Sequence, residues 1–417
     1  MRLVGAGHAI VGRLRTHTFS ALFKHPNFRL YWFGALASNI GTWIQMVAQS
    51  WLVYDLTGST LFLGLVGFAT AIPSLFLALF GGVLADRFER RRLMMATQTG
   101  SMLLAFVLAS LTLTGITTVW HIMVIAFLNG AVNALNTPVR QTIISDLVSK
   151  EDLTNAIAIG SAQFQTSRML GPAIAGAIIA LVGPGWCFFI NGLSFLVVIA
   201  ALFKLKVPPL KAGRARVSMW RNMRDGLGYI RSEPTILSLL ALAAIPSIFG
   251  MPYIALMPAF ASSVLHVGPH GLGLLMSAAG LGAVCGALAV ASLQRGSRRG
   301  RLMLGAIVSF GLCLAAFAVS HVFVFSFVFL IGVGISSMTY NSLNQSFLQS
   351  LADDEMRGRV MSLLTLTTFG MQPFGQLGAG ALANYAGPSF AVLLGGVVCV
   401  LFALLMLAKR PTIRRLV

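Results

Sequence analysis

The chain has 417 residues, of which 57% are hydrophobic and only 10% are charged, and its mean hydropathy is +0.83. This composition excludes a water-soluble domain, in which about 25% of residues are charged, and it indicates an integral membrane protein. The formal net charge of +19 raises the alternative of a nucleic-acid partner, and the placement of the basic residues decides between the two.

Twelve apolar stretches follow one another along the chain, each close to the ~20 residues that a helix needs to cross a bilayer. We therefore predict an all-α membrane protein with membrane-spanning helices at 30–54, 60–84, 93–114, 119–140, 155–181, 185–204, 235–262, 270–292, 302–320, 322–343, 358–385 and 389–408. The helices define five regions: an N-terminal segment (1–29), a first half of six helices (30–204), a basic linker (205–234), a second half of six helices (235–408) and a tail (409–417).

The Lys and Arg residues lie almost without exception in alternate connections. Of the 30, all but Arg168 lie in segments 1–29, 87–92, 140–150, 204–231, 295–301, 357–359 and 409–415, and none lies near 55–59, 114–118, 182–185, 263–269, 321 or 386–388. Short loops rich in Lys and Arg stay on the cytoplasmic side. The distribution predicts a multi-pass protein of the cell (inner) membrane with both termini and the linker in the cytoplasm, and it leaves no reason to expect nucleic acid as a partner.

Enzymatic chemistry and metal binding find little support in the sequence. The four cysteines are scattered singly through apolar runs, without the spacing of a zinc site or a disulfide framework. No Lys follows a Gly, so the chain has no Walker A loop for ATP. No nucleophile and base stand at a useful spacing. We expect a protein that is not an enzyme and uses no metal and no cofactor.

Polar side chains recur at helical spacing in several of the predicted spans. Helix 30–54 has Ser38, Thr42, Gln45 and Gln49 on one stripe, and helix 119–140 has its asparagines on one face. Such a stripe faces either a neighbouring helix or a watery cavity, and four polar groups exceed what packing usually needs. Our candidate substrate cavity therefore comprises Thr42, Gln45, Gln49, Asn129, Asn133, Gln165, Arg168, Asn341 and Gln372.

Arg168 is the only charged residue predicted to lie within the membrane. An arginine at the centre of a spanning helix costs roughly 2.5–3.5 kcal/mol on insertion scales, so it needs a polar partner or a water-filled cavity. It shares one helix face with Ser161, Gln165 and Pro172. We expect Arg168 to contact substrate between the two halves. The alternative is a purely structural clamp to amide groups of a neighbouring helix.

The basic loop at 82–92, GVLADRFERRR, has the order Gly-x-x-x-Asp-Arg-x-x-Arg-Arg. This order resembles the signature between helices 2 and 3 of the major facilitator superfamily of secondary transporters. The resemblance implies two pseudo-symmetric six-helix halves, a substrate site between them, and alternating access. It also implies that Asp86 lies against the start of the eleventh helix and latches the inner side. The implied gating residues are Gly82, Asp86, Arg87, Arg90, Asp146 and Arg357, with Arg90 reaching Asp146.

An internal repeat supports the two halves. Sliding the chain by 204 positions places GPAIAGAIIALVGP (171–184) over GQLGAGALANYAGP (375–388). In the first copy, Gly171, Pro172 and Gly176 resemble part of the fifth-helix motif of the superfamily's antiporters. Small residues let helices approach closely, and Pro172 leaves a backbone carbonyl unpaired. We expect this segment to bend and to seal the inner gate.

Several segments across the chain resemble the macrolide-efflux and enterobactin-exporter branch, among them 51–59, 138–153 and 226–231. The resemblance implies a secondary active exporter of amphipathic small molecules such as drugs or siderophores, acting as a monomer among membrane lipids with protons as the coupling ion. A lipid flippase and an importer of a small anion are the alternatives. All 11 acidic residues lie at helix ends or in loops, which leaves Asp55 and Asp86 as possible proton carriers.

Overall fold

The computed structural model describes residues 20–87, 89–205, 228–293, 299–414 and 416, with the backbone alone at 78–87, 141 and 411. These residues are helical throughout, joined by short turns. The first half contains α2 (Ser20–Lys24), α3 (Pro26–Thr57), α4 (Thr60–Arg87), α5 (Arg90–Leu113), α6 (Val119–Leu147), α7 (Leu153–Val182) and α8 (Pro184–Lys204). Most of the predicted N-terminal segment and linker lie outside the described residues.

The second half contains α10 (Pro234–Ile245), η2 (Pro246–Gly250), α11 (Tyr253–Ala259), η3 (Phe260–Val264), α12 (Gly268–Ala291), α13 (Arg299–Val319), α14 (Phe323–Leu351), α15 (Asp354–Ala386), α16 (Pro388–Lys409) and α17 (Pro411–Arg414). Ten helical segments of the described ranges are long and apolar enough to cross a membrane. Two further helices, α3 and α15, have 32 and 33 residues but more polar sequences. A count of twelve spans therefore stays a prediction.

The predicted helices coincide with observed ones, and the largest differences are at the end of α14, which continues to Leu351 instead of ending at 343, and at the end of α6. This helix continues to Leu147 instead of ending at 140, with Pro138 inside it and with the hydroxyls of Thr137 and Thr142 donating to carbonyls of the preceding turn. Arg140, which we placed at the boundary between the predicted helix and the basic connection, therefore lies within α6. Its side chain donates to Asn39 of α3, with 3.1 Å between Nη1 and Oδ1.

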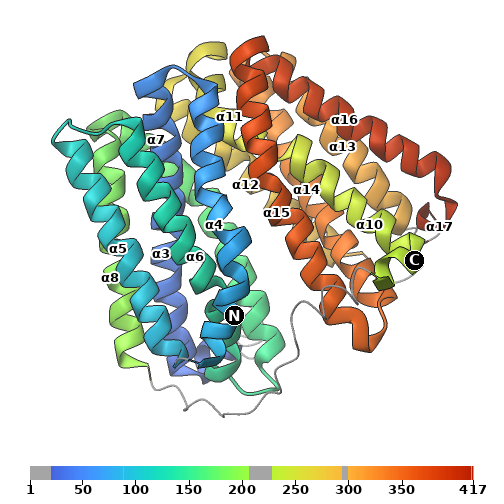
Figure 1. Cartoon of the computed structure of the whole chain (residues 1–417), viewed down its shortest axis with the longest axis horizontal. Helices are drawn as coiled ribbons and strands as arrows, with labels where there is room; N and C mark the ends of the chain where they lie inside the picture. Colours follow the sequence, from blue (N-terminus) through green and yellow to red (C-terminus); the bar gives the residue numbers. More distant parts are fainter. Residues whose placement is uncertain (1–19, 88, 206–227, 294–298, 415, 417) are drawn as a thin grey trace, which may run out of the picture.

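The helices form two bundles, one from each half, which meet along two contact lines (Figure 1). One line joins α4 to α15 and the other joins α7 to α12. A Cβ atom added at Gly176 of α7 would lie 2.7 Å from the carbonyl oxygen of Pro269, at the start of α12. A Cβ added at Gly380 of α15 would lie 2.7 Å from the carbonyl oxygen of Thr60, at the start of α4. Each line therefore depends on glycine for backbone contact between the halves.

The repeat seen in the sequence appears in the backbone of these contact lines. Gly176 and Gly380 are 204 positions apart and make equivalent contacts in the two lines. The glycines that follow α7 and α15, Gly183 and Gly387, both have φ of +89°, a conformation that residues with a Cβ rarely adopt. Each allows the sharp reversal into the next helix, which begins with proline in both copies.

The two bundles touch at one end of the molecule and diverge toward the other (Figure 1). We call the end at which the bundles touch the sealed end. There Ser59, directly before α4, donates a hydrogen bond of 2.9 Å to Asn384 of α15. The contact between α4 and α15 continues from this bond as far as Leu75, which packs on Gly370. Helix α3 ends at Thr57 and α16 begins at Pro388, both beside the contact of Ser59 with Asn384, so their other ends, Pro26 and Lys409, lie at the diverging end. The molecule is thus closed on the side opposite the start of α3 and the end of α16.

The first spanning segment of the second half is irregular. Two π-helical turns, η2 and η3, flank the short helix α11, and prolines stand at Pro246, Pro252 and Pro258. Proline removes a backbone donor and clashes with the preceding turn, which accounts for the wider turns. Breaks of this kind concentrate at functional positions in helices. Here they present the side chains of α11 toward the first half.

Candidate functional site

A small pocket lies between the halves, just inside the sealed end. Four helices line it, through Trp43 of α3, Arg168 and Pro172 of α7, Tyr253, Ile254 and Met257 of α11, and Met276 and Ala279 of α12. Its volume of about 20 Å³ is close to that of one water molecule. A drug-sized ligand needs roughly 300 Å³ or more, so this pocket by itself is too small to hold one.

Arg168 brings a positive charge into this otherwise apolar and aromatic lining. The guanidinium is half-buried, and no described residue forms an ion pair or a hydrogen bond with it. Most buried charges in proteins are paired, because an unpaired one loses its hydration without compensation. The clamp to amide groups that we considered from the sequence is absent among the described residues. The arginine is therefore free to bind an anionic group of a ligand.

Gln165 lies one turn before Arg168 and reaches the second half. Its Nε2 lies 3.6 Å from the sulfur of Met338 on α14. The contact is weak because a thioether is a poor acceptor. Gln165 and Arg168 are thus the two polar cavity candidates that the structure places at the interface between the halves.

Two other cavity candidates, Gln45 and Asn129, face their own bundle, whereas Asn133 is exposed. Gln45 is buried and accepts a hydrogen bond of 2.6 Å from the side-chain amide of Asn191 on α8. Asn129 accepts hydrogen bonds from Ser101 of α5 and from Asn133 of its own helix, both at 3.3 Å. These contacts hold neighbouring helices together, so the expectation that Gln45 and Asn129 line the cavity is corrected. Their spacing is regular, but the shared face meets a helix and not water.

The remaining cavity candidates do not line the pocket. Thr42 is exposed, and its hydroxyl donates to the carbonyl of Ser38 at 2.8 Å. Asn341 donates to the carbonyl of Ser337 at 2.9 Å within α14. Gln49 and Gln372 are half-buried. Their part in substrate binding stays a proposal.

The gating loop is described only in part. The Arg90 guanidinium lies 2.6 Å from Oδ2 of Asp146, as the resemblance implied. The pair joins the start of α5 to the end of α6. Arg357 binds Asp354 of its own helix at 2.6 Å and the carbonyl of Gln349 at 2.8 Å. Only the backbone of Gly82, Asp86 and Arg87 is described, so the contacts expected of these residues stay predictions.

We expected the fifth-helix segment to seal the inner gate, and in this conformation it contacts the second half at the sealed end. Gly176 and Pro172 pack against Gly273 and Pro269 at the start of α12, on the side away from the termini. Gly171 packs on Trp43 within its own half. The side of the membrane that this contact seals depends on the orientation of the chain. With the orientation predicted from the basic loops it would be the outer side, and the inner gate stays an untested prediction. Helix spacing identified the close contact, whereas its depth depends on where the neighbouring helix begins.

Two parts of the site were missed by reasoning from the sequence. Met257 and Met276 line the pocket, yet in an apolar sequence no pattern separates them from ordinary packing residues. Arg140 was counted with the basic connection that follows helix 119–140, although it lies within α6 and contacts α3 and α7. The prolines around α11 were the available signal that this helix is broken.

Comparison with known families decides what kind of protein carries this site. The family described as transmembrane secretion effectors, a branch of the major facilitator superfamily, matches residues 16–415. The chain belongs to the major facilitator superfamily. It is a transporter of this superfamily and not an enzyme.

Similar proteins of the superfamily include exporters. The chain is 26% identical to the staphyloferrin A transporter of Staphylococcus aureus, over 87% of this chain and 91% of the relative. It is 25% identical to the enterobactin exporter EntS of Citrobacter koseri, over 96% and 94%. It is 26% identical to the multidrug efflux pump Tap of Mycolicibacterium fortuitum, over 93% and 99%.

Solved structures of the superfamily share the fold. A bacterial homologue of the lysosomal transporter Spinster, in an inward-facing and occupied conformation, superposes with a TM-score of 0.71 at 15% identity, covering 97% of this chain and 99% of that one. The nucleoside transporter NupG superposes with a TM-score of 0.70 at 16% identity, covering 92% and 98%. These likenesses establish an all-helical superfamily fold for this transporter.

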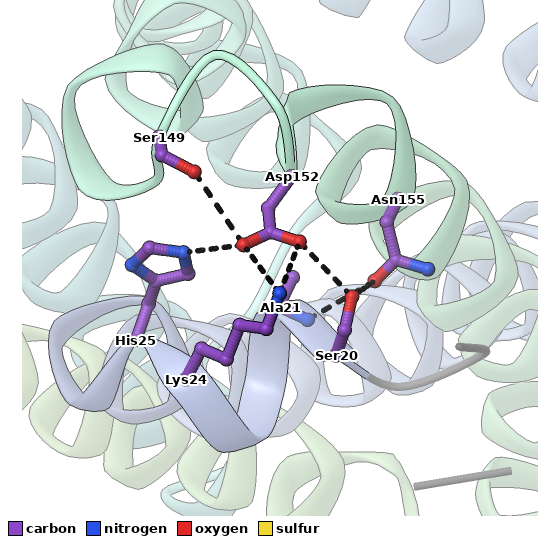
Figure 2. Close-up of polar contacts among 7 residues, drawn as sticks. All are labelled: Ser20, Ala21, Lys24, His25, Ser149, Asp152 and Asn155. Carbon is purple, nitrogen blue, oxygen red and sulfur yellow. Dashed lines mark hydrogen bonds and ion pairs between the residues drawn. The ribbon is translucent and has the colours of Figure 1, made fainter. Parts of the chain in front are cut away.

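A polar cluster away from the pocket anchors the first described helix of the transporter (Figure 2). The buried carboxylate of Asp152, directly before α7, accepts a hydrogen bond from Ser20 at 3.1 Å. It lies 3.4 Å from Nζ of Lys24 and 3.0 Å from Nε2 of His25. Asn155 accepts from the backbone N–H of Ala21 at 3.1 Å. The cluster ties α2 to the start of α7, the helix that carries Arg168.

We expect the Asp152 cluster to make the stability of the protein depend on acid. The hydrogen bond from His25, with smaller contributions from Ser20 and Lys24, holds the pKa of Asp152 below its usual range against the opposing effect of burial. A carboxyl with a lowered pKa stabilises the fold above its unfolded pKa of about 3.9 and loses that contribution as the pH falls through the folded value.

Thermal unfolding in detergent tests this expectation for Asp152→Asn. The variant should melt lower than the wild type at pH 7, and the difference should shrink as the pH falls below about 4. Glu151→Gln is the matched control, because Glu151 is exposed on the same loop. An Asp152→Asn variant that melts like the wild type at pH 7 would show that the cluster adds no stability.

Proposed function

We propose that this protein is a secondary active exporter that moves amphipathic small molecules, such as siderophores or drugs, across the cell (inner) membrane by alternating access. The observation that carries the proposal is the pocket between the halves, where Arg168 has no ion-pair partner among the described residues. Exporter relatives that match nearly the full length of the chain support it. Arg168 would bind the anionic part of a substrate, and Trp43 and Tyr253 its aromatic part.

The conformation suits a protein that takes its substrate from the cytoplasm. With both termini in the cytoplasm, as the basic loops predict, the diverging end is cytoplasmic and the glycine contacts seal the outer side. Export then requires that the inner side close and the glycine contacts separate. Asp86 against the start of α15, near Arg357, is our candidate latch for the closed inner side. Among the described residues, Arg357 forms an ion pair with Asp354 of its own helix.

Protons are the proposed coupling ion, and a monomer is the proposed functional unit. The described parts of the spanning helices carry acidic residues only near their ends, so coupling would use Asp55 at the end of α3 or Asp86 near the end of α4. A substrate that carries its own proton offers the other route.

Transport in a bacterial host that lacks its own exporters tests the proposed function. Cells that make the protein should accumulate less of a siderophore or of a cationic or anionic drug than cells with the empty vector, and an uncoupler should abolish the difference. Uptake of a small anion would instead identify an importer. Movement of a fluorescent lipid between leaflets of proteoliposomes, with no drug or siderophore efflux, would identify a flippase.

We predict the orientation of the chain from its basic loops, and thiol labelling checks it. In a cysteine-free background, a cysteine at Gly115 or Gly387 should react with a membrane-impermeant reagent added to intact cells. A cysteine at Gly213 in the basic linker should react only after the cells are permeabilised. The reverse pattern would place the termini outside and make the sealed side the inner one.

A further inference from the structure

Arg140 lies on α6 with its side chain toward α3 and α7 of the first half, although its position at the end of the predicted helix suggested the basic connection. Its guanidinium carbon lies 5.9 Å from the ring centre of Phe164 on α7, and its one described hydrogen bond goes to the neutral side chain of Asn39. Phe164 in turn packs edge-on against Trp43, with ring centres 6.1 Å apart. Trp43 lines the pocket together with Arg168.

These contacts form a continuous strip that leads from Arg140 to Arg168. Phe164 and Arg168 are four residues apart on α7, which places them on the same helix face about 6 Å apart along its axis. Arg140 lies toward the end of α6 at which the halves diverge, whereas Arg168 lies at the sealed pocket. A ligand that enters from the diverging end therefore meets Arg140 first and Arg168 second, with the two aromatic rings between them.

The strip carries two positive charges that are not neutralised by the described residues. The described ion pairs of the first half use Asp146, Asp152 and Glu89, and none of these carboxylates binds Arg140 or Arg168. An arginine has five N–H donors in a planar fork, and Arg140 uses one of them on Asn39. Two half-buried arginines to which no described carboxylate binds are electrostatically unfavourable, and a bound anion at each would relieve that.

We propose that Arg140 and Arg168 form a two-arginine site for an aromatic ligand that carries at least two negative charges, with Phe164 and Trp43 contacting the ring. Arg140 is then a specificity-determining residue, because a ligand with a single anionic group needs only Arg168. This inference deepens the proposed export function by naming the substrate class. A structural role for Arg140, as a link between α6 and α3 through Asn39, is the alternative that the experiment must separate.

Titration calorimetry on the purified full-length protein tests the site with three probes: benzamide, benzoate and isophthalate, which carry zero, one and two negative charges. We expect the wild type to bind isophthalate about tenfold more tightly than benzoate, since a second charge-assisted contact is worth at least that factor. Arg140→Gln should bind benzoate as the wild type does and lose the preference for isophthalate. Arg140→Lys should keep part of the preference.

Arg231→Gln is the control, because Arg231 is exposed and remote from the strip. A wild type without preference for isophthalate, or an Arg140→Gln variant that keeps the full preference, would overturn the inference. A lower melting temperature of Arg140→Gln with the preference retained would establish the structural link instead. The binding series does not depend on transport. A preference for isophthalate in a protein that exports nothing would refute only the proposed export function. Export by a protein without this preference would refute only the two-arginine site.

Discussion

Replacing Arg168 with alanine is expected to lower export at least tenfold while the protein still folds and inserts. The guanidinium is half-buried in the pocket and has no ion-pair partner among the described residues, so its removal breaks no described structural contact. A hydrogen bond to a charged group contributes about 1.5–3 kcal/mol, which corresponds to about a ten- to hundredfold loss of transport efficiency. Efflux of a siderophore or drug from cells with matched amounts of protein measures the effect.

Arg168→Lys separates recognition from charge. Lysine keeps the positive charge but lacks the planar fork, so it should lose part of the export and should change the ranking of substrates. Arg231→Ala is the matched control, since it makes the same truncation at an exposed site. Normal efflux by Arg168→Ala would show that the arginine does not bind substrate.

Gly380→Leu is expected to prevent the sealed end from closing and so to stop the transport cycle. A Cβ at this position would lie 2.7 Å from the carbonyl oxygen of Thr60 and 2.9 Å from the Cα of Gly64. Both obstacles are backbone atoms, which cannot move aside as a flexible side chain can. Overpacking costs about 1–3 kcal/mol, equivalent to about a five- to 150-fold shift between conformations. The atoms of leucine beyond Cβ increase this steric cost further.

Spin labels measure directly how far the two halves separate at the sealed end. Leu56 and Tyr385 are exposed at the sealed end, one in each half, and the distance between labels at these positions should lengthen in Gly380→Leu. Gly378→Leu is the control, because a Cβ at Gly378, on the same helix, meets no atom within 4 Å. An unchanged distance together with normal efflux in Gly380→Leu would mean that the contact does not form during transport.

Much of this architecture could be predicted from the sequence, because the bilayer sets the length of apolar stretches. The expected spans coincide with observed helices to within a few residues at most ends, and the 204-residue repeat marks Gly176 and Gly380, which make equivalent contacts between the halves. Arg168 could be selected in advance for a related reason. A single charge in an apolar helix is unfavourable unless a cavity or a partner accepts it, so its presence alone indicated a site.

The surroundings of each polar face were decided only by the tertiary structure. Helical periodicity determines which side chains share a face, but the rotation of a helix in its bundle determines what that face meets. The face with Gln45 meets Asn191 of α8, and Asn129 meets Ser101 of α5, so both pack within a bundle. Arg140 lies in the interior because α6 continues past 140 and turns this side chain toward Asn39 and Phe164.

The tertiary structure also decided at which end of the molecule the gate lies. The sequence by itself determined that small residues around Pro172 permit a close helix contact. Gly176 seals the side away from the termini because α12 begins beside it, with Pro269 and Gly273 at the contact. Backbone contact at Gly176 requires a partner helix at the same depth in the membrane. That partner, α12, lies about a hundred residues later in the chain, and its position depends on how the two halves pack. The spacing of residues within α7 does not encode that position.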